Sequence, residues 1–154
     1  MKITRKRSRN NQFITLALVV CALLLSPAQA SVKTTDIPGQ LINALTVYKK
    51  DNIRGFITAL VRGSPLEGHQ EMSMQVLVLE KIEKHYGAYQ SYDILHINKL
   101  SDSTRLIYFL LNYKKGPVFG KLTAFKDGER ETITAFEFHT KAEKIFPDAL
   151  LISH

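Results

Sequence analysis

The sequence has almost no cysteine. Its 154 residues contain one, Cys21, which lies inside an uncharged apolar run near the N-terminus. A mature chain without this segment has no thiol, which excludes a disulfide, a thiolate metal site and a cysteine nucleophile. We therefore expect the hydrophobic core alone to stabilise the domain in an oxidising compartment.

The sequence also lacks an apolar run long enough to be a typical membrane span. The run Phe13–Leu25 has 13 residues, whereas a transmembrane helix needs about 20. It follows a basic start and precedes Ala28 and Ala30, an order typical of a secretory signal. We predict that residues 1–30 are a signal peptide cleaved after Ala30, and that residues 31–154 are one exported domain, periplasmic or secreted, with no stable membrane span. The alternative is an uncleaved single-span anchor.

Residues 31–154, without the predicted signal peptide, have almost no net charge. The formal net charge is +7, from 21 Lys and Arg against 14 Asp and Glu. Five of the basic residues and none of the acidic ones lie in residues 1–30, so 16 basic residues remain against 14 acidic ones. A domain so close to neutral has no basic stripe, and we expect no nucleic-acid partner.

Apolar spacing predicts helices in the first half of the domain. Residues 36–62 carry two apolar sets at helical spacing, separated by Lys49–Asn52, which predicts two short helices or one broken helix. Asp51 fits the N-cap of the second piece. Residues 64–67, Ser-Pro-Leu-Glu, form a capping-box pattern that predicts a helix from there to the C-cap Gly87.

No side chain of this predicted helix suggests a metal or cofactor site. His69 and His85 are 16 residues apart in the sequence, too far to share a metal, and are expected to be solvated or capping. Met72 and Met74 are expected to fill gaps in the core. We therefore predict no metal and no cofactor.

From Tyr89 onward, the pattern changes to short runs rich in Tyr, Phe, Ile and Thr, which favours strands. Turn signals at Ser101–Asp102, Lys115–Gly116 and Asp127–Gly128 divide the segment. The predicted strands are residues 90–99, 103–114, 117–126 and 129–140. The fold class is therefore α+β, with N-terminal helices packed on a strongly bent antiparallel meander of four or more strands.

Counting residues from two-residue hairpins assigns each strand residue to a face of the sheet. One face should pack on the helices and collects Ile94, Ile107, Phe109, Leu111, Val118, Leu122, Ala124, Ile133 and Ala135. The other face, which includes Ile97, is also apolar and needs a cover. We expect a homodimer through four aromatic residues of this outer face, Tyr108, Phe119, Phe136 and Phe138. The alternative is that the C-terminal segment, with Ile145 and Phe146, covers it.

The same count places three polar side chains together at one end of the helix-facing surface. Tyr113, Glu137 and His139 would supply a phenol, a carboxylate and an imidazole at the mouth of an apolar pocket. Such a group can bind a polar part of a ligand or perform acid–base chemistry. The alternative is a frayed strand end with solvated side chains.

Several of these segments together resemble the nuclear transport factor 2-like superfamily. They are the Tyr-Lys-Lys-Gly-Pro turn at 113–117, the Asp-Gly hairpin at 127–128, the closing Phe-Glu-Phe-His-Thr at 136–140 and the Ile-Phe-Pro at 145–147. The chain is similar to small exported bacterial members of unassigned function. The resemblance implies a cone-like sheet wrapped on helices, often with a pocket and often dimeric through the outer face.

The superfamily contains isomerases and dehydratases, and also non-catalytic binding, transport and assembly domains. No catalytic motif of an enzymatic branch matches this sequence, and fold analogy alone does not make it an enzyme. We expect a non-enzymatic cell-envelope domain that binds a small apolar ligand or a protein partner. One alternative is a cofactor-free isomerase or dehydratase using Tyr113, Glu137 and His139. Another is an envelope secretion subunit anchored by Phe13–Leu25.

Overall fold

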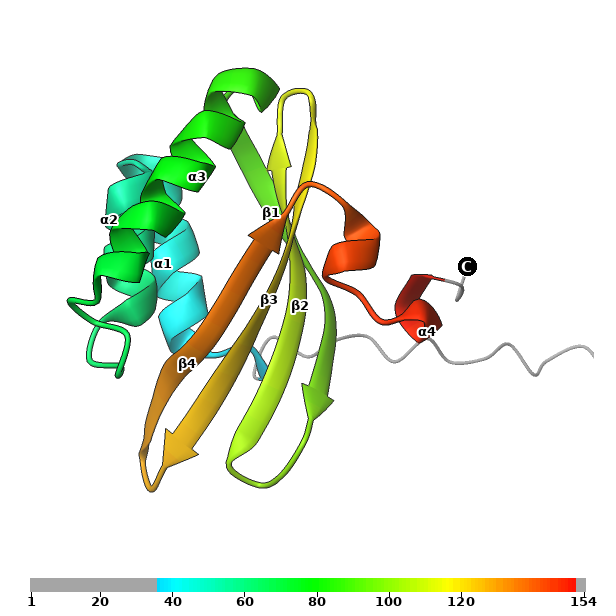
Figure 1. Cartoon of the computed structure of the whole chain (residues 1–154). Helices are drawn as coiled ribbons and strands as arrows, with labels where there is room; N and C mark the ends of the chain where they lie inside the picture. Colours follow the sequence, from blue (N-terminus) through cyan, green and yellow to red (C-terminus); the bar gives the residue numbers. More distant parts are fainter. Residues whose placement is uncertain (1–35, 152–154) are drawn as a thin grey trace, which may run out of the picture. The chain divides into compact units, whose positions relative to one another are not determined.

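The computed structural model describes residues 36–151, in which three helices precede a four-stranded antiparallel sheet (Figure 1). This confirms the predicted α+β class. The predicted signal peptide and its cleavage site lie outside the described residues. The elements in chain order are α1 (Gly39–Lys50), α2 (Ile53–Val61), α3 (Gln70–Tyr86), β1 (Tyr89–Lys99), β2 (Thr104–Tyr113), β3 (Gly116–Asp127), β4 (Arg130–His139), the 3-10 turn η3 (Ala142–Lys144) and α4 (Asp148–Leu151).

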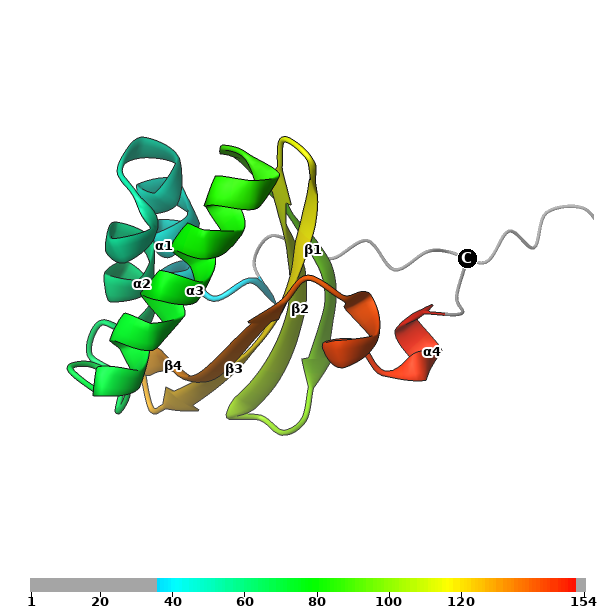
Figure 2. The same cartoon turned by 45° about the horizontal axis from the view of Figure 1, so that its top comes forward.

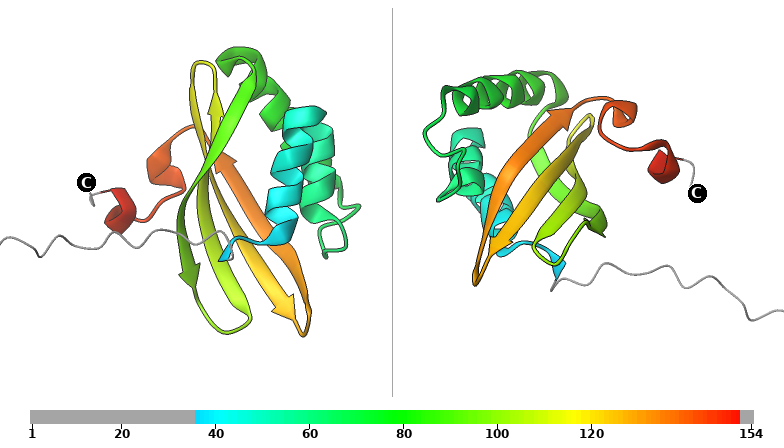
Figure 3. Two further views of the ribbon diagram at one scale, coloured as in Figure 1. Left: turned by 180° about the vertical axis from the view of Figure 1, so that it is seen from behind. Right: turned by 60° about the horizontal axis from the view of Figure 1, so that its bottom comes forward.

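The sheet separates the helices from the C-terminal segment. Helices α1, α2 and α3 lie on one face, and η3 with α4 lies on the other (Figures 1 and 2). The strands follow in the order β1-β2-β3-β4, and the sheet curls without closing, as both views in Figure 3 show. We call the face toward the helices the inner face and the opposite one the outer face.

The first two helices form a short antiparallel pair. Asn52, rather than the predicted Asp51, is the N-cap of α2, and its Oδ1 accepts a hydrogen bond from the Gly55 N–H at 2.9 Å. The Gln40 side chain on α1 donates to the carbonyls of Leu60 and Arg62 at 2.7 and 2.9 Å, which satisfies the end of α2. The sequence between the two apolar sets therefore separates two helices.

The capping-box sequence at 64–67 closes a turn and does not begin a helix. Glu67 Oε2 accepts from the Gly63 N–H at 2.6 Å, and Ser64 Oγ accepts from the Leu66 N–H at 3.1 Å. Helix α3 begins at Gln70 and ends before Gly87, whose φ of 82° explains the glycine at this C-cap. The predicted end of this helix is confirmed and its predicted start is wrong.

The register of the sheet contains three single-residue irregularities, at Gln90, Leu95 and Thr134, and the last two change the predicted faces. In β1, Ile94 pairs with Phe109 but His96 pairs with Tyr108, so Leu95 is an extra residue. In β4, Ile133 pairs with Ala124 but Ala135 pairs with Thr123, so Thr134 is extra. Each such bulge reverses the alternation of side chains beyond it.

The bulges correct part of the predicted face assignment. Ile97 lies on the inner face opposite Ile107, and Phe136 and Phe138 lie on the inner face opposite Leu122 and Gly120. Their predicted place on the outer face is therefore wrong. Ala135 is exposed opposite Thr123, so its predicted inner position is also wrong. The other predicted inner-face residues of β2 to β4 are buried, and Ile94 packs against the same core.

The core lies between the inner face and the three helices. Leu41 and Leu45 of α1, Phe56 and Leu60 of α2, and Leu79 of α3 are almost fully buried there. They meet inner-face residues of the sheet in one continuous hydrophobic cluster that includes Ile107, Phe109, Leu111, Val118, Leu122, Ala124, Ile133 and Phe138. The helix side of the sheet is therefore a packed interior.

Candidate functional site

Tyr113, a predicted pocket residue, is buried at the end of β2 and bonded to another phenol. Its hydroxyl lies 2.7 Å from that of Tyr48 on α1. The Tyr48 ring stacks on Tyr89 at 4.3 Å between centroids and on Phe56 at 5.0 Å. The hydrogen bond satisfies both buried hydroxyls, so this part of the predicted pocket is core.

Burial also keeps these phenols protonated near neutral pH. Desolvation raises the pKa of Tyr113 to about 12 and that of Tyr89 to about 12. Burial raises the pKa of Tyr48 above its ordinary value as well, and the neighbouring Tyr113 adds to the effect. All three phenols therefore stay protonated under ordinary conditions and cannot act as bases.

Glu137 and His139 lie on the outer face, across the sheet from Tyr113. Glu137 pairs with Lys121 and its carboxylate lies 3.0 Å from the Lys121 Nζ. His139 pairs with Phe119, and its Nδ1 accepts a hydrogen bond from the Lys141 N–H at 2.9 Å. The bulge at Thr134 places both side chains away from the helices, so the structure does not bring the three predicted site residues together.

Aromatic rings fill the middle of the space between the sheet and helix α2. Phe138 contacts Phe56 at 6.0 Å and Phe109 at 5.8 Å between ring centroids, and Phe136 at 5.5 Å. Phe56 and Phe109 are fully buried, and so is Leu79. This is the packing of a filled core.

The C-terminal segment covers part of the outer face. The Phe146 ring makes edge contacts with Tyr108 and Phe119, at 5.7 and 5.4 Å between centroids. Ile145, Phe146 and Tyr108 form a second small cluster against Leu106 and Leu110. Of the four predicted dimer residues, Tyr108 and Phe119 are therefore on the outer face, where the C-terminal segment covers them. This is the cover that the alternative prediction gave for the outer face.

The outward face of α3 carries an apolar surface that the sequence analysis did not single out. Met74, Leu77 and Val78 have 59%, 55% and 42% of their surface exposed. Their i, i+3, i+4 spacing places them side by side on the helix, and we call them the α3 stripe. Met74 is thus not the core residue that we predicted. The opposite side of α3 supplies the buried Val76 and Leu79.

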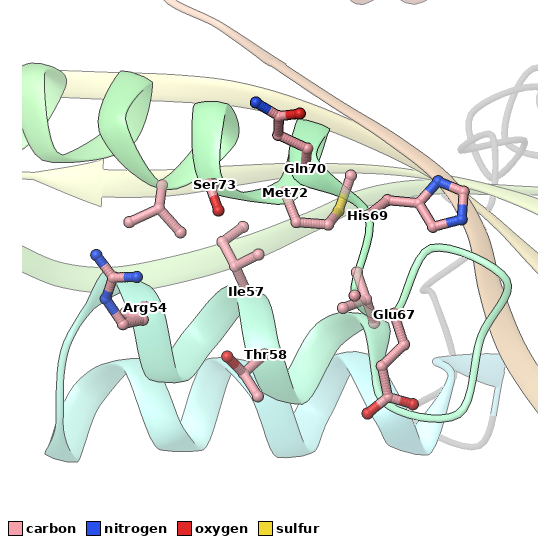
Figure 4. A pocket seen from close by; sticks show the side chains of 11 residues that line it. Arg54, Ile57, Thr58, Glu67, His69, Gln70, Met72 and Ser73 are labelled. Atoms are coloured by element: carbon pink, nitrogen blue, oxygen red, sulfur yellow. The ribbon is translucent and has the colours of Figure 1, made fainter.

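A shallow groove adjoins the α3 stripe. It lies between α2 and α3 and has a volume of about 220 Å3. Figure 4 shows Ile57 and Met72 along its middle, with Arg54 at one end and Glu67 and His69 at the other. The remaining lining residues are Thr58, Val61, Gly68, Gln70, Ser73 and Val76.

The groove and the stripe form one continuous surface along α3. Gln70 and Ser73 line the groove and precede Leu77 by seven and four residues, so these three side chains follow the same side of the helix. The surface therefore has an apolar ridge, an apolar floor and charged ends. The signal for it in the sequence is a second apolar row on α3, offset from Val76 and Leu79.

Between residues 36 and 151, no three His, Cys, Asp or Glu side chains lie close enough together to hold a metal ion. None of the helices in that range combines the length and the apolar character required to cross a membrane.

Comparison with protein-family models, with curated proteins and with solved structures found no match to this chain. The structure itself defines the class as an α+β domain with three helices on one face of a curled four-stranded antiparallel meander. The resemblance to the nuclear transport factor 2-like superfamily stays a prediction.

Proposed function

We propose that this chain is an exported domain that binds a protein partner through the α3 stripe and the adjoining α2–α3 groove. The exposure of Met74, Leu77 and Val78 on one side of a 17-residue helix carries the proposal. Exposed apolar side chains that lie together favour association, because contact with a partner removes them from water.

A protein partner fits these observations better than a small apolar ligand. The middle of the helix–sheet interior is filled by Phe56, Phe109 and Phe138, whereas the exposed apolar atoms of α3 lie on a ridge. Small ligands generally bind in concave sites that enclose most of their surface. No geometry here favours the acid–base alternative, because Tyr113 lies on the other side of the sheet from Glu137 and His139.

Export is proposed from the N-terminal pattern, and it has a direct test. N-terminal sequencing of the protein from its own cells should give a start at Ser31. A start at Met1 would instead support the alternative of a subunit anchored by Phe13–Leu25.

Partner binding is tested by a photoreactive amino acid placed at Leu77 of the full chain in its own cells. Irradiation should give one defined adduct, whose components mass spectrometry identifies. The matched control is the same amino acid at Leu100, which is 57% exposed in the turn after β1. Adducts of the same pattern from both positions, or none from Leu77, would contradict the proposal.

A further inference from the structure

Helix α3 carries apolar residues on two sides, and only one of them is covered by the described part of the chain. Val76 and Leu79 face the core, while Met74, Leu77 and Val78 face outward. Of the eight large hydrophobic side chains that are exposed within residues 36–151, these three fall within five consecutive residues. The α3 stripe is therefore a concentrated surface, unlike the scattered exposed residues of the sheet.

The stripe lies at the centre of its helix. Helix α3 runs from Gln70 to Tyr86, and Leu77 and Val78 lie at its middle. If two copies of α3 pack antiparallel about a two-fold axis at this point, Leu77 of one copy meets Val78 of the other. Met74 then meets the apolar stem of Lys81. Such an isologous contact uses the same patch twice and closes on itself.

The charges at the two ends of the stripe suit this arrangement. Glu71 is exposed in the first turn of α3, and Lys81 and His85 are exposed toward its end. All three lie on the same side of the helix as Met74 and Val78, at spacings of three, four or seven residues. Antiparallel pairing brings Glu71 of one copy to the basic end of the other, whereas parallel pairing would place like charges together. The helix dipoles also favour the antiparallel arrangement.

The outer face is less suited to bind a second copy, because part of it is already covered. Ile145 and Phe146 are buried against Tyr108, so a partner at this point would first have to displace the C-terminal segment. The α3 stripe needs no such rearrangement.

We propose that the occupant of the α3 stripe is a second copy of this chain, packed antiparallel through α3. The proposal rests on the proposed function, because it names the partner of the same surface. It predicts a two-fold dimer with both sheets on the outside and with the outer faces free.

Cysteine cross-linking tests the pairing and its direction. In a Cys21→Ser background of the full chain, Leu77→Cys should give a disulfide-linked dimer on mild oxidation, because the two residues 77 approach each other near the axis. Glu71→Cys and His85→Cys should each give no disulfide-linked dimer alone and should cross-link when mixed. Cross-linking of Glu71→Cys with itself would overturn the antiparallel arrangement. Lys126→Cys, exposed at the end of β3, is the control and should not cross-link.

Sedimentation of the purified protein gives an independent result. The unmodified chain should have twice the mass of a monomer, and Leu77→Glu should halve it while the circular dichroism spectrum is unchanged. Leu100→Glu, at an equally exposed site, should leave the dimer intact. A monomeric unmodified chain without cross-links would overturn the inference of a second copy. In that case, an adduct from Leu77 with a different protein in cells would still support the proposed function, and its absence would overturn both.

Discussion

The ring of Phe109 lies so close to Gly120 that a Cβ atom at position 120 would be 2.6 Å from Phe109 Cζ. Gly120 pairs directly with Phe109 across β2 and β3, and both are buried on the inner face. The absent side chain therefore makes room for the ring. Phe109 in turn packs edge-on against Phe138, which limits its movement.

Gly120→Ala should destabilise the fold by about 1–3 kcal/mol, because the added methyl group overlaps a ring in a filled core. Urea unfolding followed by circular dichroism measures the change. Gly39→Ala is the matched control, since a Cβ there meets no atom within 4 Å in the structure. It should leave the free energy of unfolding unchanged or slightly raised. Equal stability of the two variants would mean that the Phe109 ring moves aside freely.

Tyr113→Phe should cost about 1–3 kcal/mol, because it leaves the buried Tyr48 hydroxyl without its partner. Tyr48→Phe should cost a similar amount for the same reason. The double variant removes both hydroxyls and should be close to the unmodified protein in stability. Urea unfolding of all four proteins completes the cycle, and strictly additive losses would argue against a shared hydrogen bond.

Stability should fall as the pH rises above about 10, the ordinary pKa of tyrosine. Burial raises the pKa of Tyr113 and of Tyr89 to about 12, so between these values the unfolded chain releases protons that the folded chain retains. Proton release then favours unfolding. Melting temperatures from pH 8 to 12 measure the effect. The Tyr48→Phe/Tyr113→Phe variant should show a shallower decline, and an identical decline would exclude these two phenols as its source.

Phe146→Ala should release the C-terminal segment from the outer face. The ring contacts both Tyr108 and Phe119, and its loss should cost about 3 kcal/mol. Trypsin cleavage at Lys141 and Lys144 should then become more than about tenfold faster, because it follows the population of the open segment. Leu151→Ala, at an exposed site, is the control. Unchanged cleavage of Phe146→Ala would mean that other contacts hold the segment.

Much of the fold could be predicted because its signals are local. The apolar spacing marked the helices, and the turn residues marked four strands within one or two residues of their observed bounds. The inner-face position of Phe109, Leu111 and Leu122 also followed from the alternation of side chains along a strand. The start of α3 did not, because the side chains of Ser64 and Glu67 accept hydrogen bonds from the Leu66 and Gly63 N–H groups and so close a turn.

The candidate site could not be predicted because it depended on register. Glu137 and His139 were assigned to the inner face by counting from the hairpin, and the extra residue Thr134 reversed that count. In the structure, Ile133 and Phe136 both lie on the inner face although they are three positions apart. Strict alternation along a strand does not allow this spacing, and the sequence alone does not show where it is broken. The exposure of Met74 depended on how α3 lies against α2 and the sheet, which local patterns do not specify.

The bulge at Thr134 also has a consequence for the loss of a residue from β4. Because Thr134 is the residue without a partner on β3, a chain that lacks it can keep Ile133 opposite Ala124 and Phe136 opposite Leu122. Deletion of a paired residue such as Phe136 would instead shift the pairing of Phe138. Thr134 is therefore the position in β4 where a residue can be removed without moving an inward side chain to the outer face.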